Sequence, residues 1–393
     1  MRVSAGQTGG QGVSAYATRS RFVVSNYGMG GSLQSGMAES RWGGPAAALL
    51  KWETTNQFDI GLDIAFLNNR VNLTVDAYYK KTKDLLLDKL IPMSSGFSRI
   101  QANYGNVTNK GLEISGHFIP VKARNFLWSI DANISFNRNK VGGLDADQYS
   151  DVAWGIENMF LVRNGEPIGT LYGYVEDGFY DNEAEVRADP LYRNETDSKV
   201  KSMVGEVKYK NLDDDPVIDN RDRQIIGNTN PDYQYGITNT LEWKNWTFSF
   251  FLQGTQGNDV LNVNLKKFDM ASVDNMPYFI YNNRWTAENR ANAKWPRANR
   301  TSTRSMKASD RYIEDGSYLR CKNVSLSYRF RHPMKFVESI NLVASVSNLF
   351  TISGYSWMDP DVNSFGSDPK RRGVDMASYP SARTFNFGVQ IGF

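Results

Sequence analysis

Residues 383–393 read RTFNFGVQIGF, and this stretch decides the fold. Its large apolar side chains stand at every second position and would share one face of a strand; they are Phe385, Phe387, Val389, Ile391 and Phe393. Strict alternation over about ten residues is typical of a strand with lipid on one side and a polar lumen on the other. Soluble sandwich strands also alternate, but they usually span only about five or six residues. The stretch therefore predicts a transmembrane β-barrel strand.

The same alternation recurs along the whole chain. From Phe58 to Phe66 every second residue is large and apolar, and the pattern returns from Val71 to Tyr79 after a short turn. We expect about ten membrane-length strands in all. They are predicted within 1–8 and at 57–66, 71–80, 112–118, 126–137, 233–243, 246–252, 323–330, 340–346 and 383–393.

The connections between these strands fall into two classes that alternate strictly. Short connections are expected near 67–70, 121–125, 244–245 and 331–339. Long connections are expected near 9–52, 85–106, 140–230, 259–316 and 353–381. An antiparallel up-and-down outer-membrane barrel has this order, with short periplasmic turns and long extracellular loops. The sequence therefore predicts an all-β transmembrane barrel whose end, Phe393, lies in the periplasm.

Composition excludes several other classes of protein. No run approaches the ~18 consecutive apolar residues that a membrane helix needs, and the mean hydropathy is -0.49. Lys plus Arg number 45 against 42 for Asp plus Glu, so the net charge of +3 gives no reason to expect a nucleic-acid partner. The single cysteine excludes an intrachain disulfide. No nucleophile elbow or phosphate-binding loop is present, and we predict that the protein is not an enzyme.

The first residues indicate whether the chain forms a whole barrel or part of one. Met1 is followed directly by RVSAGQTGG, without the charged and apolar regions of a signal peptide. A sheet of about ten strands that stayed open would leave two unpaired edges, which lipid does not tolerate. We therefore expect residues 1–393 to be the C-terminal portion of a larger barrel.

Several long strings resemble one family. They are KWETTNQFDIGLDIAFLNNRVNLTVDAYYKKTKDLLL (51–87), GFSRIQANYGNVTNKGLEISG (96–116), GEPIGTLYGYVEDGFY (165–180), DRQIIGNTNPDYQYGITNTLEW (222–243), FLQGTQGNDV (251–260), DRYIEDGSYLRCKNVSLSY (310–328), NLFTISGYSWMDPDV (348–362) and SYPSARTFNFGVQIGF (378–393). Together they resemble the SusC/RagA-type TonB-linked outer-membrane transporters of Bacteroidota. The resemblance runs in order along the whole chain.

The resemblance implies a plugged barrel of about 22 strands in the outer membrane of a Gram-negative bacterium. It implies import of bulky nutrients, mostly oligosaccharides and sometimes peptides, powered through the TonB complex and capped by a SusD-like lipoprotein. The plug and the TonB box have no counterpart in residues 1–393, so contact with TonB would need an N-terminal part outside this chain. Phe393 resembles the C-terminal signal that the outer-membrane assembly machinery reads.

One acidic segment has the spacing of a calcium-binding loop. Oxygen-bearing residues and one backbone carbonyl match the ligand positions of an EF-hand loop; they are Asn211, Asp213, Asp215, Val217, Asp219 and Asp222. The corresponding segment of the family resembles DLNGDGVID. Pro216 replaces the usual glycine and Asp222 the longer glutamate, so the alternative is a solvated acidic turn. No cofactor is required, and Ca²⁺ is the one candidate.

Aromatic side chains in the predicted loops are candidates for stacking on sugar rings. They are Trp154, Tyr174, Tyr281, Trp285 and Trp357. The alternative is that these rings pack loop against loop or lie in the aromatic belt at the membrane interface.

The sequence alone leaves two other functions open. The roughly ten strands could close by themselves into a small passive pore or surface adhesin, since bacterial barrels begin at about eight strands. A soluble β-rich glycan-binding protein is the third hypothesis, and it requires folding without detergent.

Overall fold

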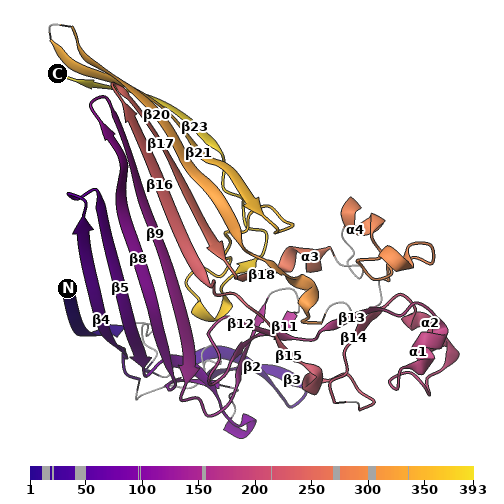
Figure 1. The fold of residues 1–393 in the computed structure, drawn as a ribbon. Helices are drawn as coiled ribbons and strands as arrows, with labels where there is room; N and C mark the ends of the chain where they lie inside the picture. The colour runs from indigo at the N-terminus through magenta and orange to yellow at the C-terminus, as the bar shows by residue number, and fades with distance from the viewer. Residues whose placement is uncertain are drawn as a thin grey trace.

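A large open antiparallel sheet dominates the computed structural model of the chain (Figure 1). The structure describes residues 1–10, 18–19, 22–39, 50–95, 97, 99–152, 156–213, 215–268, 275–299, 307–334 and 336–393. The sheet has ten strands, and neighbours in space are also neighbours in chain order. They are β1 (Arg2–Gly10), β4 (Glu53–Phe66), β5 (Val71–Lys83), β8 (Asn106–Ala123), β9 (Phe126–Gly142), β16 (Tyr233–Trp243), β17 (Trp246–Gln256), β20 (Tyr318–Met334), β21 (Val337–Ser353) and β23 (Thr384–Gly392).

The predicted up-and-down barrel topology with ten strands is confirmed. All nine pairings between neighbouring strands are antiparallel. β1 and β23 lie at opposite edges, and no ladder joins them in the described part of the chain. The structure therefore shows an open sheet and not a closed ten-stranded barrel.

Short turns connect strands at one end of the sheet, which we call the turn end. The β4–β5 turn has three consecutive residues with positive φ, Leu67 at 55°, Asn68 at 55° and Asn69 at 62°. Asparagine tolerates this left-handed conformation better than most residues, whereas it is uncommon for a leucine such as Leu67. The β16–β17 turn uses Lys244 in the same region, at φ 53°.

Two of the predicted short connections were too long. The expected turn at 331–339 was too long, because β20 continues to Met334 and β21 begins at Val337. The expected turn at 121–125 shrinks to 124–125. Backbone hydrogen bonds continue where the apolar alternation has already stopped, and a register shift between Arg331 and Met334 absorbs the irregular sequence.

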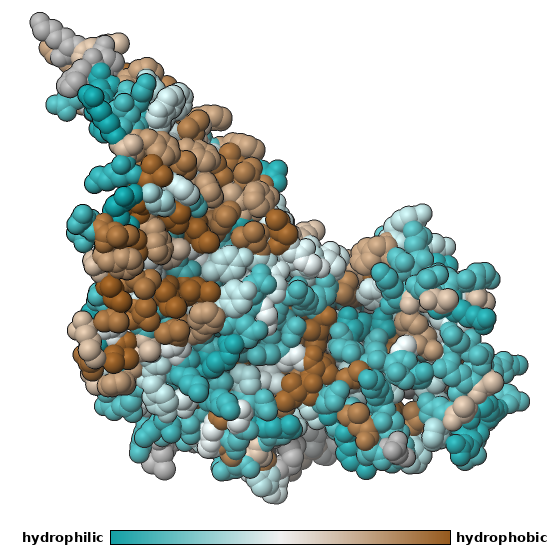
Figure 2. Space-filling view, viewed as in Figure 1, coloured by the Kyte–Doolittle hydropathy of each residue, from teal (hydrophilic) through white to brown (hydrophobic). Residues whose placement is uncertain are grey.

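The ladder register aligns side chains into rows that cross the sheet. On the outer face one row joins five neighbouring strands through Leu62, Val75, Ile114, Ile134 and Tyr235. Such side chains stay open to the surroundings, as Leu62 with 46% exposure illustrates. Figure 2 shows the resulting hydrophobic band across the strands, with hydrophilic surface beyond it. This band is the surface that a bilayer covers.

The adjacent row faces the other side of the sheet and is polar. It is the row that would line a barrel lumen, and we call this side the lumen face. It runs through Gly61, Asp76, Glu113, Ser135, Gln234, Thr255 and Tyr318. Alternation along each strand thus becomes two chemically different faces of one sheet.

Long connections gather at the other end of the sheet, which we call the loop end, and they are folded. The segment after β9 begins at Gly143, three residues later than predicted, and contributes a four-stranded sheet. That sheet joins β10 (Gln148–Val152), β11 (Ile156–Val162), β12 (Thr170–Gly173) and β15 (Gln224–Asn228). A second, three-stranded sheet joins β18 (Asp259–Asn262), β19 (Ile313–Asp315) and β22 (Val374–Asp375).

Smaller elements complete this loop layer. Hairpins are formed by β2 (Phe22–Met29) with β3 (Ser32–Glu39), β6 (Leu86–Leu90) with β7 (Arg99–Asn103), and β13 (Glu176–Phe179) with β14 (Val207–Tyr209). The short helices are α1 (Glu183–Ala188), α2 (Asp197–Met203), α3 (Val263–Lys267) and α4 (Tyr278–Asn282). No helix in the described ranges is long and apolar enough to cross a membrane.

The main hydrophobic core lies in the loop layer and not in the large sheet. Its central cluster draws fully buried side chains from three separate connections, among them Phe160, Leu261 and Val374. The sequence had predicted these connections only as long loops. They fold because they stand in water, where burial of their apolar side chains lowers the free energy.

A charge on the outer face should destabilise the barrel. We expect Ile114→Lys, in the apolar row, to cost about 2–4 kcal/mol because lysine near the bilayer midplane is desolvated. Ser115→Lys, one residue along on the lumen face, is the matched control and should cost much less. The folded fraction in outer membranes, read from heat-modifiable gel mobility of the full-length protein, distinguishes the two. Equal losses would contradict the assignment of faces.

Candidate functional site

The lumen face carries an ion-pair network at the edge formed by β1, β4 and β5. Arg2 Nε lies 2.8 Å from Asp63 Oδ2, and Arg2 Nη2 lies 3.0 Å from Asp76 Oδ1. Thr74 donates a hydrogen bond of 3.0 Å to Asp63. A Cβ at Gly61 would stand 2.2 Å from Asp76 Oδ1, so the network needs a glycine there. Exposed pairs of this kind add little stability, and their main effect is to make the wall hydrophilic.

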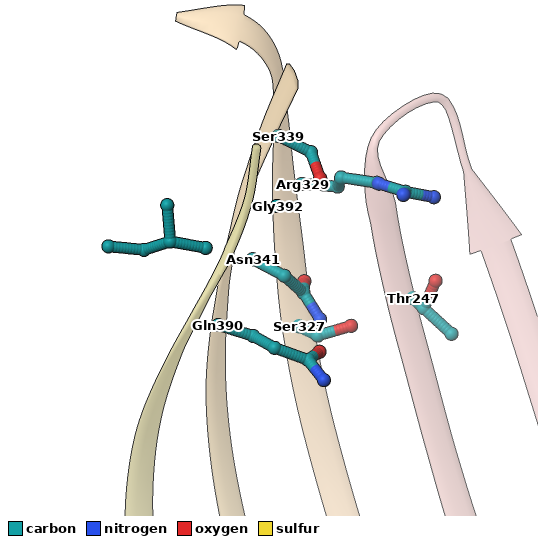
Figure 3. Close-up of a pocket in the computed structure, with 8 residues that line it drawn as sticks. Thr247, Ser327, Arg329, Ser339, Asn341, Gln390 and Gly392 are labelled. Atoms are coloured by element: carbon teal, nitrogen blue, oxygen red, sulfur yellow. The ribbon is translucent and has the colours of Figure 1, made fainter. Parts of the chain in front are cut away.

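A hollow of about 480 Å³ lies near the turn end of the lumen face. Thr247, Ser327, Asn341 and Gln390 extend into it from four neighbouring strands, and Arg329 is its charged member (Figure 3). The lining is therefore hydroxyl, amide and guanidinium groups that suit water or a polar protein surface.

A second, smaller pocket of about 180 Å³ lies at the loop end, and we call it the mouth pocket. One wall consists of Gln234, Thr255 and Tyr318, which stand side by side on three neighbouring strands. The opposite wall comes from the connection between β21 and β23 and includes Asp361, Asn363 and Arg372. The pocket thus joins the polar row of the lumen face to the loop layer.

A buried arginine supports this part of the mouth. Arg320 is 1% exposed and forms an ion pair with Asp359. Its Nε donates to Thr351 at 3.0 Å and its Nη1 to Ser381 at 3.1 Å. These partners lie far apart in the sequence, so no local pattern could have identified them. The pair is enclosed by hydrogen bonds on every side, the condition under which a buried ion pair is tolerated.

The acidic segment of residues 211–222 is closed by its own arginine. Arg221 Nη1 lies 3.2 Å from Asp213 Oδ2, Nη2 lies 3.0 Å from Asp219 Oδ2, and Nη2 also contacts Asp215. Hydrogen bonds from Arg221 hold the pKa of Asp219 below its usual range. These contacts therefore stabilise the loop at neutral pH, and the contribution is lost as the pH falls through that lowered pKa.

Among the remaining predicted calcium ligands, Asp222 is engaged through both carboxylate oxygens and Asn211 only through its amide nitrogen. The Asp222 carboxylate accepts backbone N–H bonds of 2.8 Å from Leu212 and from Asp219. Asn211 donates through Nδ2 to the Asp215 carbonyl at 2.6 Å, while its Oδ1, the atom that would bind a cation, is buried without a hydrogen-bond partner. No group of three His, Cys, Asp or Glu side chains in the described ranges, which leave out Asp214, is arranged to hold a metal ion.

This donor set does not fit Ca²⁺ as it stands, because a guanidinium occupies the centre of the carboxylates. Val217 contributes a backbone N–H to Asp215 at 2.8 Å and lies on the exposed side of the loop. Calcium binding at this loop stays a prediction. The geometry favours Arg221 as the cation that these carboxylates surround.

The predicted aromatic residues occupy different environments. Tyr174 and Trp285 are each 8% exposed, so burial removes both from the rings on which a ligand can stack. Tyr174 packs 5.4 Å from Tyr209, and Trp285 donates its Nε1–H to Asp181 at 3.1 Å. Trp357 is half-buried against Phe268.

Tyr281 is the predicted ring that remains half exposed, at 50%, with the Arg284 guanidinium 3.8 Å from its ring centre. It lies on α4 beside Tyr278, at 78% exposure, and beside Phe279, at 45% exposure, which the sequence reasoning did not select as a ligand contact. The run PYFIY at 277–281 was the available signal. Trp154 lies outside the described residues.

A cationic and aromatic cluster lies under β12, and the sequence reasoning missed it. The Arg223 guanidinium lies 4.8 Å from the centre of the Tyr172 ring and 5.5 Å from that of Tyr174. Burial lowers the pKa of Arg223. Its Nη2 donates to the carbonyls of Asn158 at 2.6 Å and Tyr172 at 3.0 Å, which ties three segments of the loop layer together.

Phe393 follows the last residue of β23 and is 85% exposed. Its predicted role as an assembly signal is neither supported nor contradicted by this geometry and stays a prediction.

Comparison with known proteins identifies the class. The family described as "TonB dependent receptor-like, beta-barrel" matches residues 2–349. TonB-dependent receptor P26 of Formosa agariphila is 33% identical over 403 residues, which cover 100% of this chain and 40% of that protein. TonB-dependent receptor SusC of Bacteroides thetaiotaomicron is 29% identical over 353 residues, covering 88% of this chain and 32% of its own length.

Solved structures show the same fold. The RagAB peptide importer in its closed-closed state superposes with a TM-score of 0.76 at 18% identity, over 100% of this chain and 40% of the matched chain. The chain thus spans about 40% of the length of the first relatives it matches. It belongs to the TonB-dependent receptor-like β-barrel family, and it resembles SusC. It is an integral outer-membrane protein of the Gram-negative type.

Removing the arginine from the acidic loop should create a dependence on calcium. In Arg221→Gln three carboxylates lose their shared cation and repel one another, so we expect the loop to become protease-sensitive and to recover in millimolar Ca²⁺. Wild-type protein in detergent should keep its protease resistance in EGTA. Arg221→Lys, which retains the charge, is the control and should stay closed without calcium. Loss of wild-type resistance in EGTA would instead support a calcium ion in the native loop.

Proposed function

We propose that this chain forms barrel wall and extracellular loops of a TonB-dependent importer of bulky nutrients, with oligosaccharides as the substrate class. The observation that carries the proposal is the unbroken polar row on the lumen face, which ends at the mouth pocket. A hydrophilic path of this kind suits a solute that keeps many hydrogen bonds while it crosses the membrane. The resemblance to SusC supports the same function.

Oligosaccharides are favoured over peptides by the side chains at the loop end. Tyr278, at 78% exposure, presents an open aromatic ring on which a sugar ring can stack. Amide and carboxylate groups of the mouth pocket offer the mixed donors and acceptors that hydroxyl groups need. Peptide import is the alternative, because the structurally similar RagAB is described as a peptide importer.

The proposal includes three partners. A SusD-like lipoprotein would cap the loop end from outside, and energy would come from the TonB complex through parts of the protein beyond residues 1–393. The outer-membrane assembly machinery would insert the barrel, with Phe393 in the sequence that it reads. The chain itself performs no catalysis in this scheme.

Growth of the source bacterium tests this function. Deleting the full-length gene should abolish growth on one class of oligosaccharide and leave growth on its monosaccharide unchanged, because only the larger solute needs the importer. Uptake of the labelled oligosaccharide should stop when a protonophore collapses the proton-motive force, and a SusD-like lipoprotein should co-purify with the receptor in mild detergent. Growth loss on peptides alone would assign peptide import instead.

A passive pore would conduct ions and would take up the solute without the proton-motive force. Steady ion conductance of the purified full-length protein in planar bilayers, together with uptake that survives the protonophore, would overturn TonB-dependent import. A sealed, non-conducting protein supports it.

A further inference from the structure

The mouth pocket has three properties that together define a ligand site. It lies on the lumen face at the loop end, it is lined by polar side chains from two walls, and its residue Asp361 is anchored by neighbouring groups. The pocket has about 180 Å³ of space, less than the roughly 300 Å³ at which pockets for drug-sized ligands begin. It therefore has room for one small ring and not for a whole oligomer.

Arg372 is the cationic group of the pocket. Within the described part of the chain, no hydrogen bond or ion pair engages its guanidinium. Its neighbour Arg371 differs, because Arg371 Nε lies 2.8 Å from Asp368 Oδ2 and its guanidinium stacks 4.1 Å from the Phe365 ring centre. Two adjacent arginines thus have separate roles, one in holding the loop and one open to the pocket.

Asp361 is the acceptor on the same wall. Its side chain is 49% exposed, and its Oδ2 lies 3.8 Å from Nη1 of the buried Arg320. The backbone N–H of Asp361 donates to Asp359 Oδ1 at 3.0 Å, which fixes the position of the residue. The Tyr318 hydroxyl also hydrogen-bonds to this carboxylate, so Asp361 is held by two neighbours and keeps its remaining lone pairs for a ligand.

Amide groups extend this set on both walls. Asn363 uses its Nδ2 in a 2.6 Å bond to the Gly366 carbonyl, which leaves its side-chain oxygen as an acceptor. Gln234 stands across the pocket on β16, beside Thr255 on β17. A ligand between the walls would meet donors and acceptors on two sides.

We propose that the mouth pocket is a subsite for one hydroxyl-rich sugar ring of the transported chain. Asp361 accepts hydrogen bonds from two ring hydroxyls, and the planar Arg372 fork donates to oxygens at the other edge of the ring. Gln234 and Asn363 complete the contacts. The inference rests on the proposed import of oligosaccharides and adds where a single sugar is held before it enters the lumen.

Saturation-transfer NMR on the purified full-length receptor tests the subsite. The probes are methyl glucoside, methyl galactoside and methyl mannoside, with triglycine as the peptide probe. We expect at least one glycoside to bind and triglycine not to bind. Asp361→Asn and Arg372→Gln should each weaken glycoside binding about tenfold or more, because each removes a charge-assisted hydrogen bond.

Two further variants make the result decisive. Lys370→Gln, two residues away and outside the pocket, removes a charge that holds neither the loop nor the pocket and should leave glycoside binding unchanged. Thr255→Trp fills the pocket from the strand side without touching either charge and should abolish the signal. Heat-modifiable gel mobility shows that each variant is folded.

Three outcomes would overturn the subsite: no glycoside bound, glycoside binding unaffected by all three pocket variants, or triglycine bound in their place. The growth experiment separates this result from the import function. If all pocket variants still support growth on the oligosaccharide, the subsite is contradicted and the import function is not. If the gene deletion leaves growth on every oligosaccharide unchanged, both proposals are contradicted.

Discussion

The structure depends on one constraint, the need of every backbone N–H and C=O group in lipid to find a partner on a neighbouring strand. That requirement produces nine antiparallel ladders in chain order. A shift of one residue in any ladder would exchange its two faces. The register is therefore what places Leu62 and Ile114 toward the bilayer and Asp76 and Glu113 toward the lumen.

The loop layer obeys a different rule, because it stands in water. Its stability comes from burial of apolar side chains, such as Phe160 and Leu261, which arrive from separate connections. Among the described residues, the buried Arg320 forms an ion pair with the buried Asp359. On the surface, Arg221 pairs with three carboxylates and so reduces their mutual repulsion.

These two parts meet at the loop end, where function is proposed. The polar row of the lumen face reaches Gln234, Thr255 and Tyr318, and the connection before β23 supplies Asp361 and Arg372 across from them. Many proteins bind ligands in this way, with binding residues on loops that a rigid sheet holds in position. Transport would then begin where a sugar leaves the loops and meets the first side chains of the wall.

The sequence by itself determined the faces of the strands, their number and order, and which ends carry long connections, because alternation of period two is local. Strand limits such as Met334 were missed, since backbone pairing continues without an apolar pattern. Only the tertiary structure decided which loop residues are open: Tyr174 and Trp285 became buried, Tyr281 stayed exposed, and Arg221 took the centre of the acidic loop. Burial and pairing depend on chain segments distant in sequence, and local patterns carry no information about them.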